Sequence, residues 1–326
     1  MEIETSARLH LSLIDLNGLE GRLDGGIGIT LEKPSLKMEC AQTNDDTIVE
    51  FNENISLPNF GLYESKIMEA TTKMKEYFEI EDNYSFKINE MYQIHHGLGL
   101  GTQLALSTAK LISSLNDMNL TGFELANIIQ RGGTSGIGVH SFDKGGLIID
   151  GGHKKSIKND FLPSSASKVS PPPLLARYDF PKDWDIILVT PNVSQGASGN
   201  EEIDIFQSYS PININEVEKI CYLTLMKLMP SVIENDIESF GDSVNKIQSM
   251  GFKRIERDLQ GAEINNVLEG MESLGIPCVG MSSFGPTCFG ITDSLSKKLK
   301  KELIDIAGND TDIIFTKGKN HGAIIK

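Results

Sequence analysis

The segment His95-His96-Gly97-Leu98-Gly99-Leu100-Gly101-Thr102-Gln103 is the most distinctive stretch of this 326-residue chain. Its three glycines occupy every second position, so one edge of the loop lacks side chains and backbone N–H groups can approach a ligand closely. Apolar residues at helical spacing follow up to Leu115, and the N-terminus of such a helix carries partial positive charge. The segment therefore predicts a site for a phosphate or diphosphate group.

Two better-known phosphate-binding loops do not match this segment. A Walker A loop ends in Lys followed by Ser or Thr, whereas this loop ends in Thr102-Gln103. A Rossmann fingerprint follows a strongly apolar strand, and none leads directly into His95. A glycine-rich bend that needs only positive φ angles is the structural alternative.

A strand with two basic residues on one face stands near the start of the chain. Apolar and polar residues alternate from Ala7 to Ile14, which predicts a strand with one buried face. Arg8 and His10 share a face of this strand, opposite Leu9 and Leu11. Because arginine suits bidentate contact with phosphate or carboxylate, this face is a candidate ligand site. A solvated sheet face is the alternative.

Other glycine-rich segments also carry basic or hydroxyl side chains. They occur at 131–140, at 150–153, at 194–199 and at 280–288. Arg22 and Asp24 border a turn at Gly25-Gly26 and could belong to the same pocket. Loops at strand ends commonly carry function, although each of these segments could be a plain loop.

Periodicity and turn residues predict an α+β chain and not a doubly wound fold. Strands are expected at 7–14, 27–31, 36–40, 85–88, 145–150, 185–190, 276–280, 287–292 and 312–316, and helices at 66–78, 104–115, 121–130, 214–229, 232–250, 262–274 and 294–307. Thr121 with Glu124, and Ser231 with Glu234, match the capping box that starts a helix.

A proline-rich stretch predicts the division into domains. Residues 158–173 are rich in Ser and Pro and end in three consecutive prolines, which resist both helix and central strand. We therefore place a linker or long surface loop there, with domains at 1–175 and 176–326.

Composition argues against several classes of function. The 30 basic and 45 acidic residues give a net charge of −15, which argues against a broad surface for nucleic acid or anionic lipid. No apolar run approaches the ~18–20 residues that span a bilayer, and no secretory signal is evident, so a cytoplasmic protein is expected. The four cysteines are far apart and suit reduced, buried thiols better than disulfides or a zinc site.

Three of these segments together resemble the GHMP kinase superfamily. Residues 97–107 are similar to its ATP-binding motif, Pro-x-x-x-Gly-Leu-Gly-Ser-Ser-Ala, and residues 282–287 to its C-terminal glycine-rich motif. Ser135-Gly136-Ile137 matches the stretch before the kinase catalytic aspartate, but Gly138 stands in the place of that aspartate, although Asp143 is close in sequence. The resemblance implies a two-domain α+β fold, with a ribosomal-protein-S5-like N-terminal domain and a ferredoxin-like C-terminal domain.

A narrower resemblance, to the β-ribofuranosylaminobenzene 5′-phosphate synthase family, rests on several motifs in the same order. They lie at 7–10, 15–18, 24–28, 95–103, 131–140, 142–146, 150–153, 283–287 and 319–323. The resemblance implies an early enzyme of tetrahydromethanopterin biosynthesis. This family joins phosphoribosyl diphosphate to 4-aminobenzoate or 4-hydroxybenzoate and releases CO₂ and diphosphate.

The same resemblance implies partners and cofactors. A homodimer is expected from the family, and Mg²⁺ is expected to accompany the diphosphate. No organic cofactor is expected, because the para amino or hydroxyl group of the acid pushes electrons into the ring. A small-molecule kinase of the same superfamily and a non-catalytic ligand-binding protein are the alternative functions.

Candidate roles follow from the residues and the resemblance together. The candidate catalytic residues are Arg8, His10, His96, His140 and His153, and the candidate Mg²⁺ ligand is Thr102. The candidate substrate-binding residues are Arg22, Asp24, Gly25, Gly26, Gly97, Leu98, Gly99, Gly101, Thr102, Gln103, Arg131, Gly132, Gly133, Ser135, Gly136, Ser283, Gly285 and Thr287.

Overall fold

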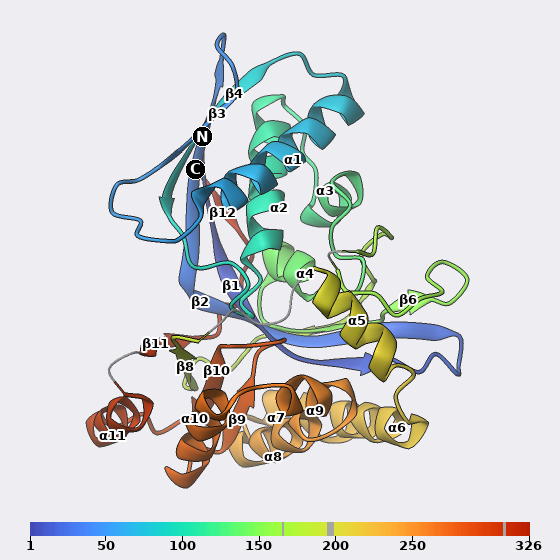
Figure 1. The fold of residues 1–326 in the computed structure, drawn as a ribbon, viewed down its shortest axis with the longest axis vertical. Helices are drawn as coiled ribbons and strands as arrows, with labels where there is room; N and C mark the ends of the chain where they lie inside the picture. The colour runs from blue at the N-terminus through green and yellow to red at the C-terminus, as the bar shows by residue number, and fades with distance from the viewer. Residues whose placement is uncertain (165, 194–198, 309–310) are drawn as a thin grey trace.

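The computed structural model describes residues 1–164, 166–193, 199–308 and 311–326. Figure 1 shows an upper and a lower half, each built from a β-sheet with helices packed against it. The predicted α+β class is therefore confirmed. Both ends of the chain lie close together in the upper half (Figure 1).

The sheet of the upper half has eight strands. Its main path runs in the order β12 (Ile324–Ile325), β1 (Glu2–Asp15), β2 (Arg22–Thr43), β4 (Asn83–Glu90) and β3 (Ile48–Phe51). The long strand β2 also pairs with β5 (Leu147–Asp150) and β6 (His153–Lys154), and β5 pairs with β7 (Leu174–Tyr178). The two strands predicted at 27–31 and 36–40 are one strand, because β1 pairs with β2 on both sides of Pro34.

Four helices cover this sheet: α1 (Phe60–Phe78), α2 (Leu100–Leu115), α3 (Gly122–Ile128) and α4 (Ile137–Lys144). Helices α2 and α4 pack directly on β1 and β2. Helix α2 follows the glycine-rich segment as predicted, but it begins at Leu100 and not at residue 104, so Gly101, Thr102 and Gln103 lie in its first turn. The capping box at Thr121 and Glu124 is confirmed, since each side chain accepts the backbone N–H of the other residue.

The lower half has a four-stranded antiparallel sheet. Its order is β11 (Thr311–Lys317), β8 (Asp185–Pro191), β10 (Cys288–Thr292) and β9 (Cys278–Met281). Helix α8 (Ile237–Gln248) packs on β9, and α10 (Ala262–Ser273) packs on β8, β9 and β10. The remaining helices are α5 (Asn200–Tyr209), α6 (Ile214–Leu223), the π-helical η1 (Thr224–Leu228), α7 (Met229–Glu234), α9 (Gly251–Asp258) and α11 (Lys297–Ala307).

The capping box predicted at Ser231 and Glu234 is wrong. Both residues lie inside α7, and the next helix begins instead after Asp236, whose side chain accepts the N–H of Ser239. The prediction of four buried cysteines is also wrong in part, since Cys221 is exposed. Among the described residues, no helix is long and apolar enough to cross a membrane.

The two halves share one large core. The rings of Phe180, Trp184 and Phe240 pack together, with centroid distances of 5.1–5.8 Å, and belong to the same buried cluster as Leu9 and Leu104. The chain returns to the first sheet at its end, where β12 pairs with β1. The domain boundary at residues 175 and 176 stays a prediction, and β7 on that boundary pairs with the first sheet.

Replacement of Phe240 tests this shared core. Phe240 is fully buried, so Phe240→Ala should lower the free energy of unfolding by about 3–5 kcal/mol. Urea unfolding followed by circular dichroism measures the change. The control Tyr77→Ala removes a ring that is 64% exposed and should change stability by no more than about 0.5 kcal/mol. If Phe240→Ala and Tyr77→Ala lower the free energy of unfolding by the same amount, Phe240 is not part of a shared core.

Candidate active site

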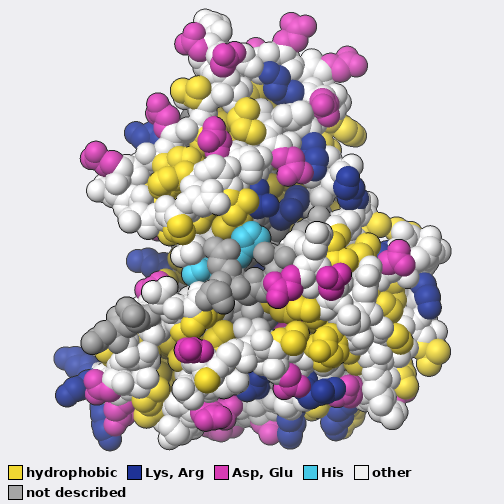
Figure 2. Space-filling model, in the orientation of Figure 1, with side chains coloured by type: hydrophobic (Ala, Val, Ile, Leu, Met, Phe, Trp, Pro, Cys, Tyr) yellow, Lys and Arg dark blue, Asp and Glu magenta, His cyan; other side chains and the backbone are white. Residues whose placement is uncertain are grey.

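A cavity of about 220 Å³ lies between the two halves. Figure 2 shows histidine side chains, with Lys and Arg side chains close by, in the hollow between the halves. Ten of the residues predicted from sequence line the cavity: Arg8, His10, Gly97, Gly99, Gly101, Thr102, Arg131, Ser135, Ser283 and Gly285. Segments from the start, the middle and the end of the chain thus meet at one site.

Backbone contacts around Gly97 hold these segments together. Ser282 donates its hydroxyl to the Gly97 carbonyl (2.7 Å) and accepts the backbone N–H of His10 (3.0 Å). Arg8 also donates to the Gly97 carbonyl. A Cβ atom at Gly97 would lie 2.2 Å from the Ser282 carbonyl oxygen, and its φ of +76° also favours glycine. Glycine is therefore required here by both space and conformation.

The start of α2 is open to the cavity. Gly99 is its N-cap, with a φ of +84°, and no side chain of the described residues caps this end. The free N–H groups and the helix dipole therefore make the start of α2 an anion site. Thr102 in the first turn also lines the cavity.

Three cations surround this helix terminus. The Arg8 guanidinium packs on Gly99, where a Cβ would lie 3.1 Å from Nε. Lys66 from α1 and Arg131 both pack against Gly101. Burial lowers the pKa of all three, that of Arg8 to about 10. Arg131 Nε is buried and lacks a hydrogen-bond partner in the described part of the chain, so this end of the cavity is built to receive an anion.

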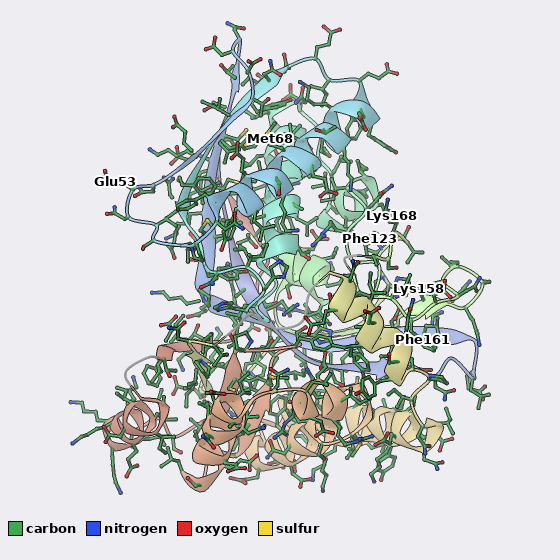
Figure 3. All side chains as sticks on the ribbon, in the orientation of Figure 1. Glu53, Met68, Phe123, Lys158, Phe161 and Lys168 are labelled. Atoms are coloured by element: carbon green, nitrogen blue, oxygen red, sulfur yellow. The ribbon has the colours of Figure 1, made fainter. Side chains whose placement is uncertain are left out.

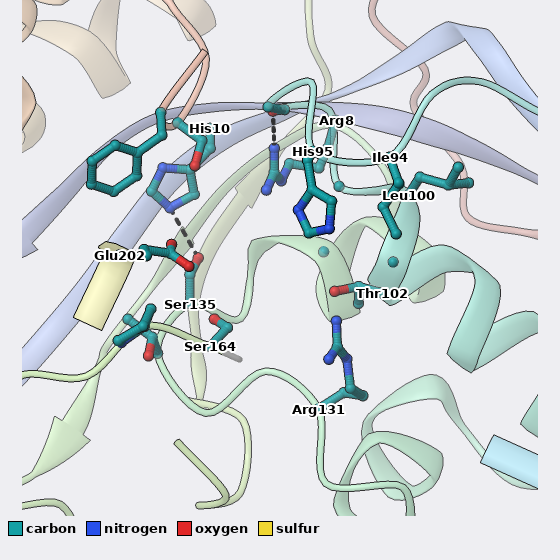
Figure 4. A pocket seen from close by; sticks show the side chains of 18 of the residues that line it. Arg8, His10, Ile94, His95, Leu100, Thr102, Arg131, Ser135, Ser164 and Glu202 are labelled. Atoms are coloured by element: carbon teal, nitrogen blue, oxygen red, sulfur yellow. Dashed lines mark hydrogen bonds between the residues drawn. The ribbon is translucent and has the colours of Figure 1, made fainter. Parts of the chain in front are cut away.

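The other end of the cavity carries aromatic side chains and a carboxylate. Leu13, Phe206 and Phe284, which pack in one cluster, line the cavity together with His10, Ser135 and Glu202. Figure 4 shows His10, Ser135 and Glu202 at one end, and Thr102 and Arg131 at the other. His10 Nε2 lies 3.2 Å from Ser135 Oγ, which lies 3.5 Å from Asp150 Oδ2. The cavity therefore has one cationic end and one aromatic end with a hydrogen-bonded histidine.

A buried ion pair lies beside the cavity and contacts the loop that carries Ser283. Lys253 and Glu256 of α9 form a salt bridge in which both side chains are almost fully buried. Lys253 Nζ also donates to the Ser283 carbonyl oxygen (2.9 Å). Burial lowers the pKa of Lys253 and raises that of Glu256. The pair holds the C-terminal glycine-rich loop against the cavity, which Glu256 also lines.

Comparison with known proteins identifies the family. A relative from Methanothermobacter thermautotrophicus, named beta-ribofuranosylphenol 5′-phosphate synthase, is 48% identical over 323 residues, covering 99% of this chain and 98% of its own. A protein of the same name from Methanocaldococcus jannaschii is 40% identical over 332 residues, covering 99% of both chains. The chain belongs to the beta-ribofuranosylphenol 5′-phosphate synthase family.

The fold of this family is that of the GHMP kinases. Residues 65–145 match the model of the GHMP kinases N terminal domain, and residues 228–306 match GHMP kinases C terminal. Homoserine kinase from Cytophaga hutchinsonii superposes with a TM-score of 0.70 at 12% identity, covering 99% of this chain and 96% of its own. Mevalonate kinase from Methanococcus jannaschii gives 0.68 at 14% identity, covering 98% of both. The predicted two-domain GHMP-type fold is confirmed, and these two likenesses show the fold alone.

The synthase chain departs from the kinase motif at Gly138, which lines the cavity on α4. A Cβ there would lie 3.1 Å from Thr102 Cγ2, so the space for a side chain is limited. Asp143, the nearest acid along the chain, instead accepts the N–H groups of Gly122 (2.6 Å) and Phe123 (3.0 Å) at the start of α3. Asp143 is thus engaged in capping α3 and does not replace the missing side chain.

Several residues predicted from sequence lie outside the cavity of the synthase. His153 Nδ1 lies 2.6 Å from Asp24, and its Nε2 lies 2.9 Å from the Ser170 carbonyl oxygen. Lys158, which follows β6 (Figure 3), pairs with the same Asp24 at 3.0 Å and donates to the Gly133 carbonyl. This buried group positions the loop that carries Ser135, and both ring nitrogens of His153 are engaged.

Other predicted residues also make structural contacts. Arg22 donates to the carbonyl oxygens of Gly151 (2.8 Å) and Gly152 (2.9 Å). His140 Nε2 lies 2.9 Å from the Pro172 carbonyl oxygen. Gln103 donates to the Gly138 carbonyl (2.9 Å). The remaining predicted residues outside the cavity are Gly25, Gly26, His96, Leu98, Gly132, Gly133, Gly136 and Thr287. Their predicted catalytic or binding roles stay predictions.

Four charged or titratable residues in the cavity were not among those predicted from sequence. They are Lys66, His95, Glu202 and Glu256. Lys66 stands at the start of a predicted helix, where a basic residue usually faces solvent. Lys253 and Glu256 have the i,i+3 spacing of an ordinary surface pair on a helix. Of these four residues, only His95 had a sequence feature that pointed to the site, because it adjoins the glycine-rich loop.

The protonation of His10 gives a test of this electrostatic picture. Burial, together with Arg8 and Lys253, lowers the pKa of His10 well below 6.5. In the unfolded chain His10 takes up its proton near pH ~6.5, so its contribution to stability is present above that pH and falls as the pH drops. Imidazole ¹⁵N NMR of the native synthase should show His10 neutral at pH 6. A titration midpoint near that of the urea-unfolded chain would contradict the assignment.

Proposed function

We propose that this synthase joins phosphoribosyl diphosphate to 4-hydroxybenzoate, releasing CO₂ and diphosphate. The relatives are named for a ribofuranosylphenol 5′-phosphate product, and a phenol product requires a hydroxyl-bearing acid. This favours 4-hydroxybenzoate over 4-aminobenzoate as the acceptor. The observation that carries the proposal is a single cavity with an anion site at one end and an aromatic lining at the other.

The geometry supplies what the reaction needs. Diphosphate must leave C1 of the ribose with the bonding electron pair, which generates an oxocarbenium-like carbon. Arg8, Lys66, Arg131 and the start of α2 would neutralise the departing charge. The ring carbon that bears the carboxylate then attacks, and loss of CO₂ restores aromaticity. Held in one cavity, the two reactants gain a high effective concentration.

Mg²⁺ would bind together with the diphosphate. The described residues contain no group of three or more His, Cys, Asp and Glu side chains that could hold a metal. Mg²⁺ usually keeps several waters and binds through one or two protein groups and substrate phosphates, so it does not require such a cluster. Thr102, which lines the cationic end, would contribute its Oγ1 to the ion. The ion would supply charge neutralisation for the leaving group.

The kinase alternative lacks a feature that phosphoryl transfer needs. A kinase must orient its attacking hydroxyl, and Gly138 has no side chain with which to do so. We also propose, from the family resemblance, a homodimer in the cytoplasm that acts in tetrahydromethanopterin biosynthesis.

Release of labelled CO₂ tests the function directly. Purified synthase with Mg²⁺, phosphoribosyl diphosphate and carboxyl-labelled 4-hydroxybenzoate should release labelled CO₂ and diphosphate in equal amounts. Labelled 4-aminobenzoate in a parallel reaction tests the second acceptor. No labelled CO₂ from either acid, or consumption of ATP with mevalonate or homoserine instead, would overturn the proposal.

A substitution at the cationic end tests the diphosphate site. Arg131→Met removes a buried cation of the anion site and should lower kcat/KM for phosphoribosyl diphosphate about 10- to 100-fold, since hydrogen bonds to charged groups contribute about 1.5–3 kcal/mol. Arg254→Met is the control, because Arg254 lies on α9 with its side chain 47% exposed. Equal kcat/KM values for the two variants would contradict this placement.

A further inference from the structure

One long helix of the lower half has an apolar outer face. Residues 214–234 form a continuous helix, because α6, the π-helical turn η1 and α7 follow one another and the junction residues all have right-handed helical backbone angles: Leu223, Thr224, Leu228 and Met229. The helix ends at Asn235, which has left-handed angles. Its inner face packs on α8, and α6 also packs on α9 and β1 (Figure 1).

The two faces of this helix differ in burial but not in polarity. The inner face is ordinary core, with buried Val217, Ile220, Leu223, Leu228 and Val232. The outer face also carries large apolar side chains at helical spacing, each between 59% and 64% exposed: Tyr222, Leu225, Met226 and Ile233. These four residues are called the outer stripe below. None of them lines the cavity between the halves.

The outer stripe is large enough to form the centre of a subunit interface. Four large side chains exposed to this extent present roughly 400 Å², which is the size of the largest apolar patch on a typical monomer, about 300–600 Å² and often functional. A standard interface buries about 800 Å² on each partner, of which about 65% is apolar in homodimers. The outer stripe therefore supplies most of the apolar area that a stable dimer needs.

The outline of the stripe is nearly the same from either end. Leu225 and Met226 are neighbours in the sequence, and both are exposed on η1 at the middle of the stripe. Such π-helical turns are rare and often occur at functional positions. Tyr222 lies before this turn and Ile233 lies after it. A stripe of this kind can pack on an antiparallel copy of itself.

Charges at the two ends of the stripe favour that antiparallel copy. Lys219 precedes Tyr222 by three residues, with its Nζ 5.2 Å from the centroid of that ring, and the exposed Glu234 adjoins Ile233. In an antiparallel pair, Lys219 of each copy faces Glu234 of the other, whereas a parallel pair would bring like charges together. An anionic membrane would be repelled by a chain of net charge −15.

We propose that the outer stripe is the interface between two copies of this chain, which pack antiparallel about a two-fold axis through η1. Tyr222 of each copy then lies against Ile233 of the other, and Leu225 and Met226 of both copies meet at the axis. Because both copies use the same surface, the contact closes as a dimer. The inference gives a surface to the homodimer of the proposed function and rests on that part of it alone.

Sedimentation equilibrium of the purified chain without substrates tests the interface. Wild type should have twice the chain mass at micromolar concentration. Leu225→Glu places two carboxylates at the axis of each dimer and should raise the dissociation constant about 100-fold or more, because like charges then meet in a desolvated contact. Ile304→Glu is the control, since Ile304 of α11 is 50% exposed and lies outside the stripe. It should leave the dissociation constant unchanged.

A charge exchange tests the antiparallel arrangement. Lys219→Glu should weaken the dimer about 10-fold, because the change occurs twice in each dimer. Adding Glu234→Lys to the same chain should restore the wild-type dissociation constant, because the facing side chains again have opposite charges. A double variant as weak as Lys219→Glu alone would overturn the antiparallel arrangement.

Two results would overturn the interface itself. One is a monomeric wild type, which would leave the stripe to a different protein. The other is a Leu225→Glu dimer as tight as that of wild type. If Leu225→Glu lacks the circular dichroism spectrum of wild type, Met226→Lys takes its place with the same expectation. None of these measurements requires turnover, so a failure of the synthase activity is distinguishable from a failure of the interface.

Discussion

Three segments that are distant in the sequence, which carry His10, Gly97 and Ser282, contact one another at the backbone of Gly97. The geometry of the cavity depends on these contacts. The Ser282 hydroxyl bridges the Gly97 carbonyl and the N–H of His10, and the backbone N–H of Ser283 returns a hydrogen bond to the His10 carbonyl (3.1 Å). No side chain fits at position 97, because a Cβ atom would lie 2.2 Å from a carbonyl oxygen. The close contact brings the start of α2, strand β1 and the C-terminal glycine-rich loop around one cavity.

The shared fold explains how a kinase scaffold can serve a different reaction. Its glycine-rich loop and the start of α2 provide N–H groups for phosphate oxygens, whichever bond is broken. A kinase adds a side chain that orients a hydroxyl nucleophile, whereas here Gly138 packs near Thr102. The cavity of this chain has the anion site at the start of α2, and aromatic side chains line its opposite end. Such a site suits a reaction in which diphosphate leaves and a ring carbon attacks.

Local patterns in the sequence predicted part of the site. The glycine spacing indicated a loop that leads into a helix, although α2 begins at Leu100, four residues before the predicted start. Period-2 alternation placed Arg8 and His10 on one face of β1, and both signals depend only on neighbouring residues. The sequence could not show that His153 is engaged with Asp24, because the two are 129 residues apart. Nor could it show that Lys66 turns inward, because on a helix only tertiary packing decides which basic residue is buried.

The central claim is that the cationic end of the cavity holds a leaving diphosphate. A crystal structure with phosphoribosyl diphosphate and Mg²⁺ bound tests it most directly. We predict the diphosphate at the start of α2, in contact with Arg131 and Lys66, with ribose C1 toward His10. Diphosphate bound at the aromatic end, or the cationic end filled by ATP while phosphoribosyl diphosphate fails to bind, would contradict the account.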